Sequence, residues 1–493
     1  MLFILKVYFC YVCLRYKAQH EVDTMKRFSL VILVTLSLLG CNTTNNNSCG
    51  YAFVGGEIVN PINDHLVLYD NIAPIDTLYL DDDNRFSFEI ESLNPGLHSL
   101  VHGGEYQVIL LEANDSLMLR LNTLDFDESL VFTGVGAKKN NYLINLSNTL
   151  ESESQQVYKF SKSKPDVFLT SIDSLKNEKI NRLESFKSKY ESSSLFNLVA
   201  NANINYSYAT HKELYPFRYF GKNDLRNRSQ LPENFYNFRK NVNYNDEMLK
   251  DFYPYYNFLF PHFNNLALDR YFEATKDTVF DKNAIEYHLN KLDLMDKLVQ
   301  HKDIKNNLLK YATRNFLSYN NSDEDCDAMF QSFEAKSSNQ EHLDYISGLY
   351  QTILKLRPGN TFPAIEVLDF KNQVHNMNAM FKGPTVVYFW SHAIKNHFKN
   401  SHLKAANLKK AFPDIKFVSI NINADKLTMW KRLLYQHNFS LDGEYRFRDA
   451  EAAKKILAIH YINKVMVVGQ NNQIITSNAN MFSNEFKGLL NEL

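Results

Sequence analysis

Three hydrophobic patterns follow one another along this chain, and each of them permits a different kind of fold. Residues 51–135 contain short runs of β-type residues, residues 136–356 repeat apolar residues at helical spacing, and residues 357–493 alternate strands with helices. A chain of 493 residues, 45% of them hydrophobic, is long enough to bury several cores. The sequence therefore predicts an α/β chain with additional all-β and helical parts.

The first pattern predicts an N-terminal antiparallel β-sandwich in residues 51–135. Phe86, Phe88 and Ile90 alternate with polar residues after the turn Asp81–Asn84, which is typical of a half-buried hairpin strand. About seven short runs at this spacing favour a small sandwich. The carboxylates of the turn could hold Ca²⁺, but the rest of an EF-hand loop is missing, so we interpret them as an exposed turn.

The second pattern predicts a central helical region. Phe168 and Ile172 recur at helical spacing after Pro165, a residue suited to the first turn of a helix. Two further amphipathic stretches cover residues 283–301 and 342–356.

The stretch from residue 235 to residue 272 is dense in aromatic side chains, and two interpretations of it stay open. We favour core packing between helices, and the alternative is a surface on which carbohydrate or peptide stacks.

The third pattern predicts a buried, mixed sheet with helices on both faces. Strands are expected at residues 362–370, 385–390, 416–422, 465–468 and 473–475, the last two as a hairpin. Helices are expected at residues 397–412, 426–437, 450–458 and 484–493.

The N-terminus carries the features of a secretory signal. A cationic stretch at residues 25–27 precedes an apolar run at residues 28–39, which is too short to span a membrane. The run ends in Leu38-Leu39-Gly40-Cys41, which resembles the lipobox of bacterial lipoproteins and implies a diacylglycerol on Cys41.

We therefore expect residues 1–40 to be a signal region, with Met25 as the true start, and residues 41–50 to be a lipidated tether. The expected location is the bacterial cell envelope, with the protein anchored by its lipid and either periplasmic or associated with the outer membrane.

Charge and cysteine content narrow the classes of partner. The chain has 54 Lys and Arg against 55 Asp and Glu, so no bulk positive field favours nucleic acid. Cys10 and Cys13 lie upstream of Met25, and processing would leave only Cys41, Cys49 and Cys326. Three cysteines give no disulfide framework.

Short motifs in residues 357–493 resemble those of a known family. They are Gly359–Pro363 before Leu368-Asp369, then Lys382–Trp390, and a hairpin turn at Gly469–Asn472. This part of the chain resembles the thioredoxin fold of TlpA-like, membrane-anchored thiol-disulfide oxidoreductases. The order of lipobox, sandwich, helical region and thioredoxin-like domain also resembles a class of bacterial envelope lipoproteins.

The chemistry of that family needs two cysteines in the pattern Phe-Trp-x-x-x-Cys-x-x-Cys. The first thiolate, stabilised at a helix N-terminus, attacks a disulfide, and the second thiol resolves the mixed disulfide. Anchoring on Trp390 places Ile394 and His397 at the two cysteine positions, and another register places Ser391 at the first. Residues 327–493 contain no cysteine, so neither register supplies a thiol.

The resemblance thus implies a thioredoxin-like fold without catalytic residues. The family's cis-proline position falls at Asn463, where we expect a trans bond because a cis bond without proline costs about 2.5–4 kcal/mol. The predicted site is the groove that remains at the degenerate active site, formed by Trp390, Ile394, His397 and Asn463.

No cofactor and no metal are expected. His392, His397 and His402 are five residues apart, which turns about 140° per step on a helix, so we expect surface histidines rather than a zinc site. Gly-x-Ser-x-Gly and phosphate-binding glycine patterns are both missing from the sequence.

Three functional hypotheses follow. The leading one is an envelope lipoprotein whose redox-inactive thioredoxin-like domain binds or scaffolds a protein or peptide partner. The second is a protein related to thiol-disulfide oxidoreductases that acts through Cys49 and Cys326 or a partner thiol, although the acidic loop Asp323–Asp327 weakens that nucleophile. The third is a receptor for peptide or glycan in the aromatic stretch.

Overall fold

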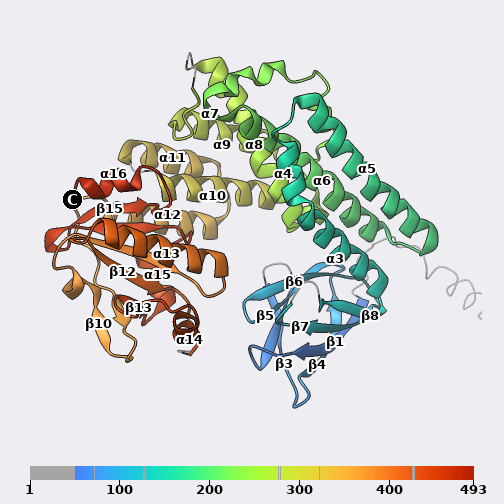
Figure 1. Cartoon of the computed structure of the whole chain (residues 1–493). Helices are drawn as coiled ribbons and strands as arrows, with labels where there is room; N and C mark the ends of the chain where they lie inside the picture. Colours follow the sequence, from blue (N-terminus) through green and yellow to red (C-terminus); the bar gives the residue numbers. More distant parts are fainter. Residues whose placement is uncertain are drawn as a thin grey trace, which may run out of the picture.

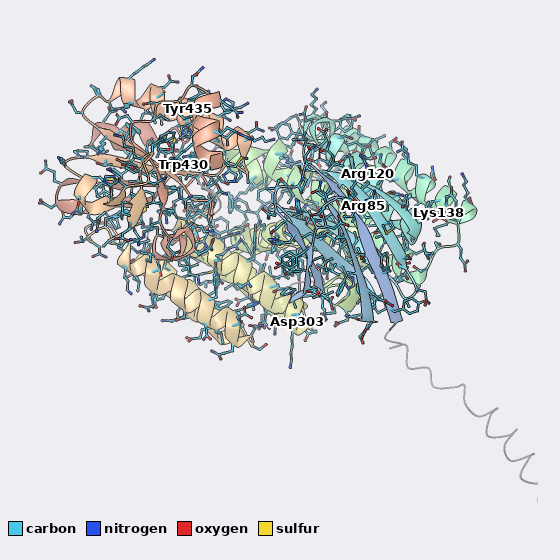
Figure 2. All side chains as sticks on the ribbon, turned by 90° about the horizontal axis from the view of Figure 1, so that it is seen from below. Arg85, Arg120, Lys138, Asp303, Trp430 and Tyr435 are labelled. Carbon is cyan, nitrogen blue, oxygen red and sulfur yellow. The ribbon has the colours of Figure 1, made fainter. Side chains whose placement is uncertain are left out.

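A computed structural model describes residues 50–493, apart from residues 71–72, 126–128, 276, 278, 321 and 425–427. Figure 1 shows strands at one end of the molecule, helices in the middle, and a second group of strands with helices at the other end. Seen from below in Figure 2, the strands with Arg85 and Arg120 and the C-terminal part with Trp430 lie apart from each other.

The signal region, Cys41 and Cys49 lie outside the described residues. Within the described part of the chain, every helix is too short or too polar to span a membrane. The lipid anchor therefore stays a prediction.

In the described residues, eight short strands follow residue 49 and form two four-stranded sheets. They are β1 Gly50–Val59, β2 His65–Asp70, β3 Ala73–Tyr79, β4 Arg85–Leu93, β5 Gly96–His102, β6 Glu105–Leu111, β7 Ser116–Asn122 and β8 Val131–Val135. One sheet has the order β4-β1-β7-β8 and the other β3-β2-β5-β6. Buried residues of both sheets, among them Val54, Leu68 and Leu117, belong to one apolar cluster.

Two details of these sheets correct the expected antiparallel hairpins. β7 runs parallel to β1, because the chain passes through β5 and β6 of the other sheet before it returns. The turn Asp81–Asn84 joins β3 to β4, which belong to different sheets. The Asp81 carboxylate accepts hydrogen bonds from the backbone amides of Asp83 at 2.9 Å and Arg85 at 2.8 Å, so it closes the turn.

The middle of the chain is helical, as expected. Its α-helices in the described residues are α3 Ala137–Ser152, α4 Ser154–Phe160, α5 Pro165–Lys189, α6 Ser194–Tyr219, α7 Gly221–Asp224, α8 Tyr253–Ala274, α9 Ile285–Leu298, α10 Lys302–Tyr319, α11 Asp323–Lys336 and α12 Gln340–Lys355. Pro165 begins α5, where Phe168 and Ile172 are fully buried. The two other predicted stretches form α9 and α12.

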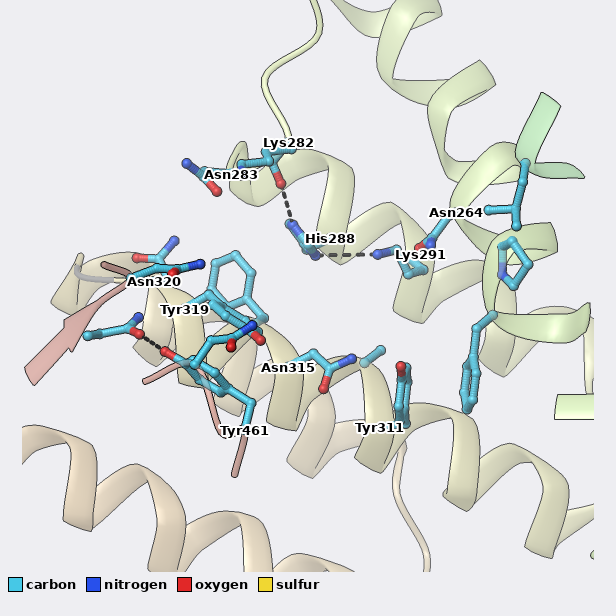
Figure 3. A pocket seen from close by; sticks show the side chains of 18 of the residues that line it. Asn264, Lys282, Asn283, His288, Lys291, Tyr311, Asn315, Tyr319, Asn320 and Tyr461 are labelled. Atoms are coloured by element: carbon cyan, nitrogen blue, oxygen red, sulfur yellow. Dashed lines mark hydrogen bonds between the residues drawn. The ribbon is translucent and has the colours of Figure 1, made fainter. Parts of the chain in front are cut away.

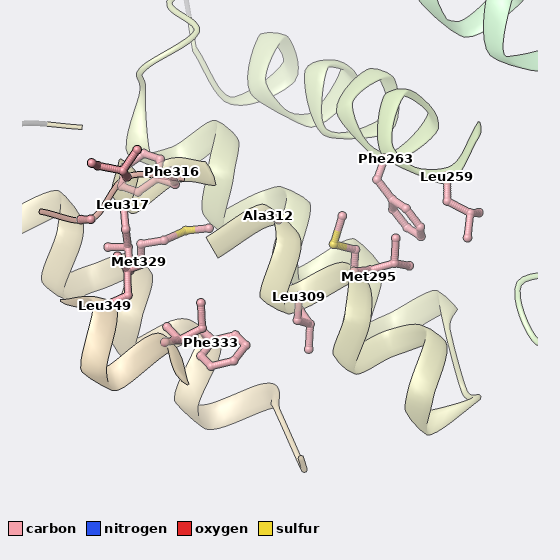
Figure 4. Packing of buried hydrophobic residues seen from close by; sticks show 14 of the residues in the cluster. Leu259, Phe263, Met295, Leu309, Ala312, Phe316, Leu317, Met329, Phe333 and Leu349 are labelled. Carbon is pink, nitrogen blue, oxygen red and sulfur yellow. The ribbon is translucent and has the colours of Figure 1, made fainter. Parts of the chain in front are cut away.

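Most aromatic side chains of the dense stretch pack inside the helical part. Tyr255, Phe258 and Phe263 of α8 are fully buried. Figure 4 shows Phe263 in the same core as Met295 of α9 and Leu309 of α10. This burial supports the core interpretation, because rings without exposed surface are not accessible to a ligand.

A buried carboxylate organises the core of the helical part. Glu213 of α6 accepts two hydrogen bonds from Arg239, at 2.8 and 2.5 Å, and one from the Asn265 amide at 2.8 Å. Nδ1 of His262 lies 2.7 Å from the same carboxylate. Burial alone would raise the pKa of Glu213, but the hydrogen bonds from His262 and Arg239 outweigh it and hold the pKa below its usual 4.5.

The C-terminal strands form a seven-stranded sheet in the order β10-β9-β13-β12-β11-β14-β15. Its strands are β9 Glu366–Leu368, β10 Val374–Asn376, β11 Thr385–Trp390, β12 Lys416–Asn421, β13 Glu444–Phe447, β14 Val465–Val468 and β15 Ile474–Ala479. The helices described beside it are α13 Lys395–Ala411, α14 Thr428–Gln436, α15 Ala450–Ile456 and α16 Phe486–Asn491. β11, β12 and β13 run parallel, and β14 is antiparallel to both β11 and β15.

Helices cover both faces of this sheet, as predicted. Val386 and Tyr388 of β11 share a cluster with residues of α13 and α16, whereas Val387 and Phe389 belong to the cluster that includes α15. Alternate residues of one strand thus face opposite layers. The expected strand at 362–370 is reduced to β9, since Pro363 lacks the amide hydrogen that a ladder needs.

Candidate functional site

The turn after β11 lies where the family resemblance places the reactive groups. Trp390 ends β11 and is fully buried. Its ring packs against Phe398 of α13 with centroids 4.7 Å apart, in a cluster that also holds Trp430. Trp390 therefore packs beneath the turn and has no surface that a ligand could contact. The prediction that Trp390 forms part of a groove is wrong for this residue.

A tight turn over residues 391–394 leads from β11 into α13. The Ile394 amide donates to the Ser391 carbonyl at 3.2 Å, and the Ala393 amide donates to Ser391 Oγ at 3.2 Å. Ile394 directly precedes α13, and its side chain is 45% exposed. The position that resembles the family's nucleophile thus presents an apolar side chain to solvent at the start of a helix.

His397 lies in the first turn of α13 and is half-buried. Both of its ring nitrogens are buried, and neither has a hydrogen-bond partner in the part of the chain that the structure describes. The ring faces Phe482, with centroids 6.1 Å apart. Burial, helped by the nearby His402, lowers the pKa of His397. We call the exposed side chains of Ile394 and Phe482, together with the half-buried ring of His397 that faces Phe482, the α13 patch.

His402 is buried, so the prediction that it is a surface histidine is wrong. Its Nδ1 lies 2.8 Å from the Phe398 carbonyl, and its Nε2 lies 3.1 Å from the Glu444 carboxylate of β13. The face of α13 that carries His402 packs on the sheet, which explains the burial. Among residues 50–493 as described, no three His, Cys, Asp or Glu side chains are grouped to hold a metal ion.

Asn463 lines a cavity of about 870 Å³ between the helical part and the C-terminal sheet. The walls come mainly from α6, α8, α9 and α10, from the residues that precede β14, and from the end of β15 with the loop after it. Stacked rings of Tyr319 and Tyr461, 4.4 Å apart, join the two parts at this cavity. Ser483 also lines it and follows Phe482 in the chain, so one short loop borders both the cavity and the α13 patch. The described peptide bonds are trans, including those of Asn463.

Two buried lysines beside or near this cavity were not predicted. Lys291 of α9 lines the cavity, and Lys464 follows Asn463. Burial lowers the pKa of each of them to about 7. The sequence held a signal for Lys291, because it shares the helical spacing of the buried residues Tyr287 and Met295.

Cys326 lies in the first turn of α11, which corrects the expected acidic loop. The Ser322 side chain caps that helix by accepting from the Asp325 amide at 3.2 Å. The Cys326 side chain is fully buried, and burial raises the pKa of its thiol although Arg357 opposes the shift. Because Cys49 lies outside the described residues, a pairing of the two cysteines stays a prediction.

Cys326 is expected to be nearly unreactive in the folded protein. Residues 42–493 with Cys49→Ser hold Cys326 as their single thiol. An aromatic disulfide reagent should react with it at least about 100-fold more slowly in buffer than in denaturant, because attack needs an exposed thiolate. Absorbance of the released thiolate gives both rates. Equal rates in the two conditions would contradict the burial.

Several known structures are similar over nearly their whole length to part of this chain. A candidate thiol-disulfide oxidoreductase from Bacteroides vulgatus is 23% identical and covers 28% of this chain and 97% of its own, with a TM-score of 0.25. The thioredoxin domain of a thiol-disulfide oxidoreductase from the same species is 15% identical and covers 27% of this chain and 97% of its own, with a TM-score of 0.23. A SCO1/SenC family lipoprotein from Bacillus anthracis is 11% identical and covers 27% and 92%, with a TM-score of 0.23. No family model and no curated protein matches the sequence. The structural neighbours of this chain include bacterial thiol-disulfide oxidoreductase domains that cover 28% of it or less.

Proposed function

We propose that this chain is a lipid-anchored protein of the bacterial cell envelope whose redox-inactive thioredoxin-like domain binds a protein or peptide partner. One observation carries the proposal. The turn connects β11 to the N-terminus of α13, yet its exposed residue is Ile394 where the family resemblance places a nucleophilic thiol. Residues 327–493 contain no cysteine that could replace it.

The surroundings of the turn favour binding over thiol chemistry. The α13 patch combines Ile394, which is 45% exposed, with Phe482, which is 38% exposed, and with His397, whose pKa is lowered by burial. Contiguous exposed apolar side chains are typical of interaction surfaces. The alternative, thiol chemistry through Cys49 and Cys326, gains no support from the buried thiol of Cys326.

The envelope location rests on the sequence. The apolar run and Leu38-Leu39-Gly40-Cys41 resemble a lipoprotein signal, and the polar residues after Cys41 would give the folded part a tether. A partner for the α13 patch would therefore be a protein or peptide of the same compartment.

Site-specific cross-linking in cells tests the proposed binding. A photoreactive phenylalanine analogue at position 394 should form a cross-link to one reproducible envelope protein, which mass spectrometry identifies. Leu403 provides a matched control, since it is an apolar residue of the same helix and is 55% exposed. The proposal is wrong if position 394 gives no cross-link, or if positions 394 and 403 give the same products.

A further inference from the structure

The cavity beside Asn463 has the size and position of a small-molecule site. Its volume of about 870 Å³ lies within the ~300–1,000 Å³ that such sites occupy. It lies between the helical part and the C-terminal sheet. Figure 3 shows His288 and Lys291 of α9 on one side of it and Tyr311 and Asn315 of α10 on the other. The side chains that face it come from several separate segments, as in most ligand sites.

Lys291 is the chemically unusual residue of the cavity. It is 7% exposed, and no carboxylate of the described residues forms an ion pair with its Nζ. Its neighbours are Nδ1 of His288 at 3.5 Å and the ring of Tyr287, whose centroid is 4.6 Å away. An ammonium group buried without an anion is destabilised, because its lost hydration is not replaced.

The hydrogen bonds of His288 fix how it meets Lys291. Nε2 of His288 lies 2.9 Å from the Lys282 carbonyl, which can only accept, so Nε2 carries the hydrogen. Nδ1 is then an acceptor and takes one hydrogen of the Lys291 ammonium group. An ammonium group has three hydrogens, which leaves donors for a ligand inside the cavity.

The rest of the wall is rich in uncharged amides and aromatic rings. Asn257, Asn264 and Asn463 line the cavity, and their side-chain amides form no hydrogen bond with any described residue. An amide both donates and accepts, which suits hydroxyl groups that do the same. Tyr311 and Tyr461 add aromatic surface for stacking. No arginine lies among the described lining residues, so none of them can form the bidentate guanidinium contact that is typical of phosphate sites.

We propose that this cavity binds a small polyhydroxylated carboxylate, of the chemical class of the sugar acids, with the carboxylate on Lys291 and the hydroxyl groups on the asparagine amides. Lys291 is the buried lysine among the described lining residues, since Lys282 is exposed and Lys464 does not line the cavity, and its one positive charge matches one carboxylate. The volume accommodates one or two sugar rings. Ile394, His397 and Phe482 are not among the residues that line the cavity, so ligand binding and partner binding are tested with different variants.

Calorimetric titration of residues 42–493 tests this proposal. The probes are D-glucuronate, D-galacturonate, D-glucose, acetate and inorganic phosphate. At least one of the two uronates should bind with a Kd of about 1 mM or tighter, and at least about tenfold more tightly than glucose or acetate. Absence of uronate binding to the wild-type chain would overturn the proposal, as would tighter binding of phosphate or equal binding of acetate.

Two variants on α9 test whether the charge of Lys291 is responsible for uronate binding. Lys291→Met keeps the length of the side chain and should weaken uronate binding at least about tenfold, to the level of glucose. Lys297→Met removes an exposed lysine from the last turn of the same helix and should leave the affinity unchanged. Lys291→Met should also fold normally, because it leaves no buried carboxylate without a partner. Unchanged uronate binding by Lys291→Met would refute the assignment, and the uronate results for wild type decide the proposal if that variant fails to fold.

Discussion

Replacement of Glu213 by glutamine is expected to lower the free energy of unfolding by about 3–5 kcal/mol. Glutamine has nearly the same shape but no charge, so the guanidinium of Arg239 would stay in the core without its anion. His262 and Asn265 would lose their charged acceptor as well. Urea unfolding followed through helix content measures the loss, because the network joins α6 to α8 and to the turn that holds Arg239.

A surface carboxylate provides the control for this prediction. Glu184→Gln removes an exposed ion pair with Lys187 on α5 and should change the stability by no more than about 0.5 kcal/mol.

The pH dependence of the stability gives a second test of the Glu213 network. Since the folded-state pKa of Glu213 is held below 4.5, its contribution is complete above that pH and is lost as the pH falls through the folded-state value. The difference between wild type and Glu213→Gln should therefore shrink in acid, and a constant difference would contradict the ionised network.

The double substitution Ile394→Cys with His397→Cys is expected to create disulfide reductase activity, which we predict that the wild type lacks. Position 394 directly precedes α13, so the helix dipole and the free backbone amides would stabilise a thiolate there. Position 397 lies one turn on, within reach for resolving a mixed disulfide. The thiol introduced at position 394 should have a pKa below the usual ~8.5, which the absorbance of the thiolate against pH measures.

A second pair of thiols tests whether position matters. Ala406→Cys with Lys409→Cys has the same spacing on exposed residues of α13, far from its N-terminus. These thiols should keep an ordinary pKa and give a much lower exchange rate. Equal activity of both pairs would show that the start of α13 does not activate a thiol.

The parts of the fold that were predictable share one property, which is a clear local sequence pattern that tertiary packing does not override. β11 and β14 are continuous apolar strands of a sheet that is covered on both faces, and α5 begins at a proline. β13 was not predicted, because Glu-Tyr-Arg-Phe carries two charged residues. Glu444 is nevertheless buried there, since His402 provides its partner.

The bounds of helix α8 were not predicted, for the opposite reason. Its apolar residues surround the helix and therefore form no stripe with a helical period. The parallel pairing of β1 with β7 could not be predicted from the sequence either, because the direction of pairing depends on the path of the chain through the second sheet. Local patterns show which segments are strands, but they do not show which sheet each strand joins.

The candidate site also has features that the sequence predicts and features that it does not. The positions of Ile394 and His397 at the start of α13 were predictable, because they follow a strand that the sequence marks clearly. The burial of Trp390 was not, since it depends on Phe398 and on Trp430 of the distant α14. The cavity around Lys291 is assembled from segments more than 100 residues apart, so no local motif could reveal it.

The rate at which purified residues 42–493 reduce a protein disulfide tests the central claim most directly. Wild type and the double variant Ile394→Cys/His397→Cys are compared in one assay, with a thiol donor in excess. The account predicts that wild type matches the uncatalysed rate while the double variant exceeds it, because only the variant carries thiols at the start of α13. A wild-type rate above the uncatalysed one would contradict the account, and the variants Cys49→Ser and Cys326→Ser would then show which of the two thiols is responsible.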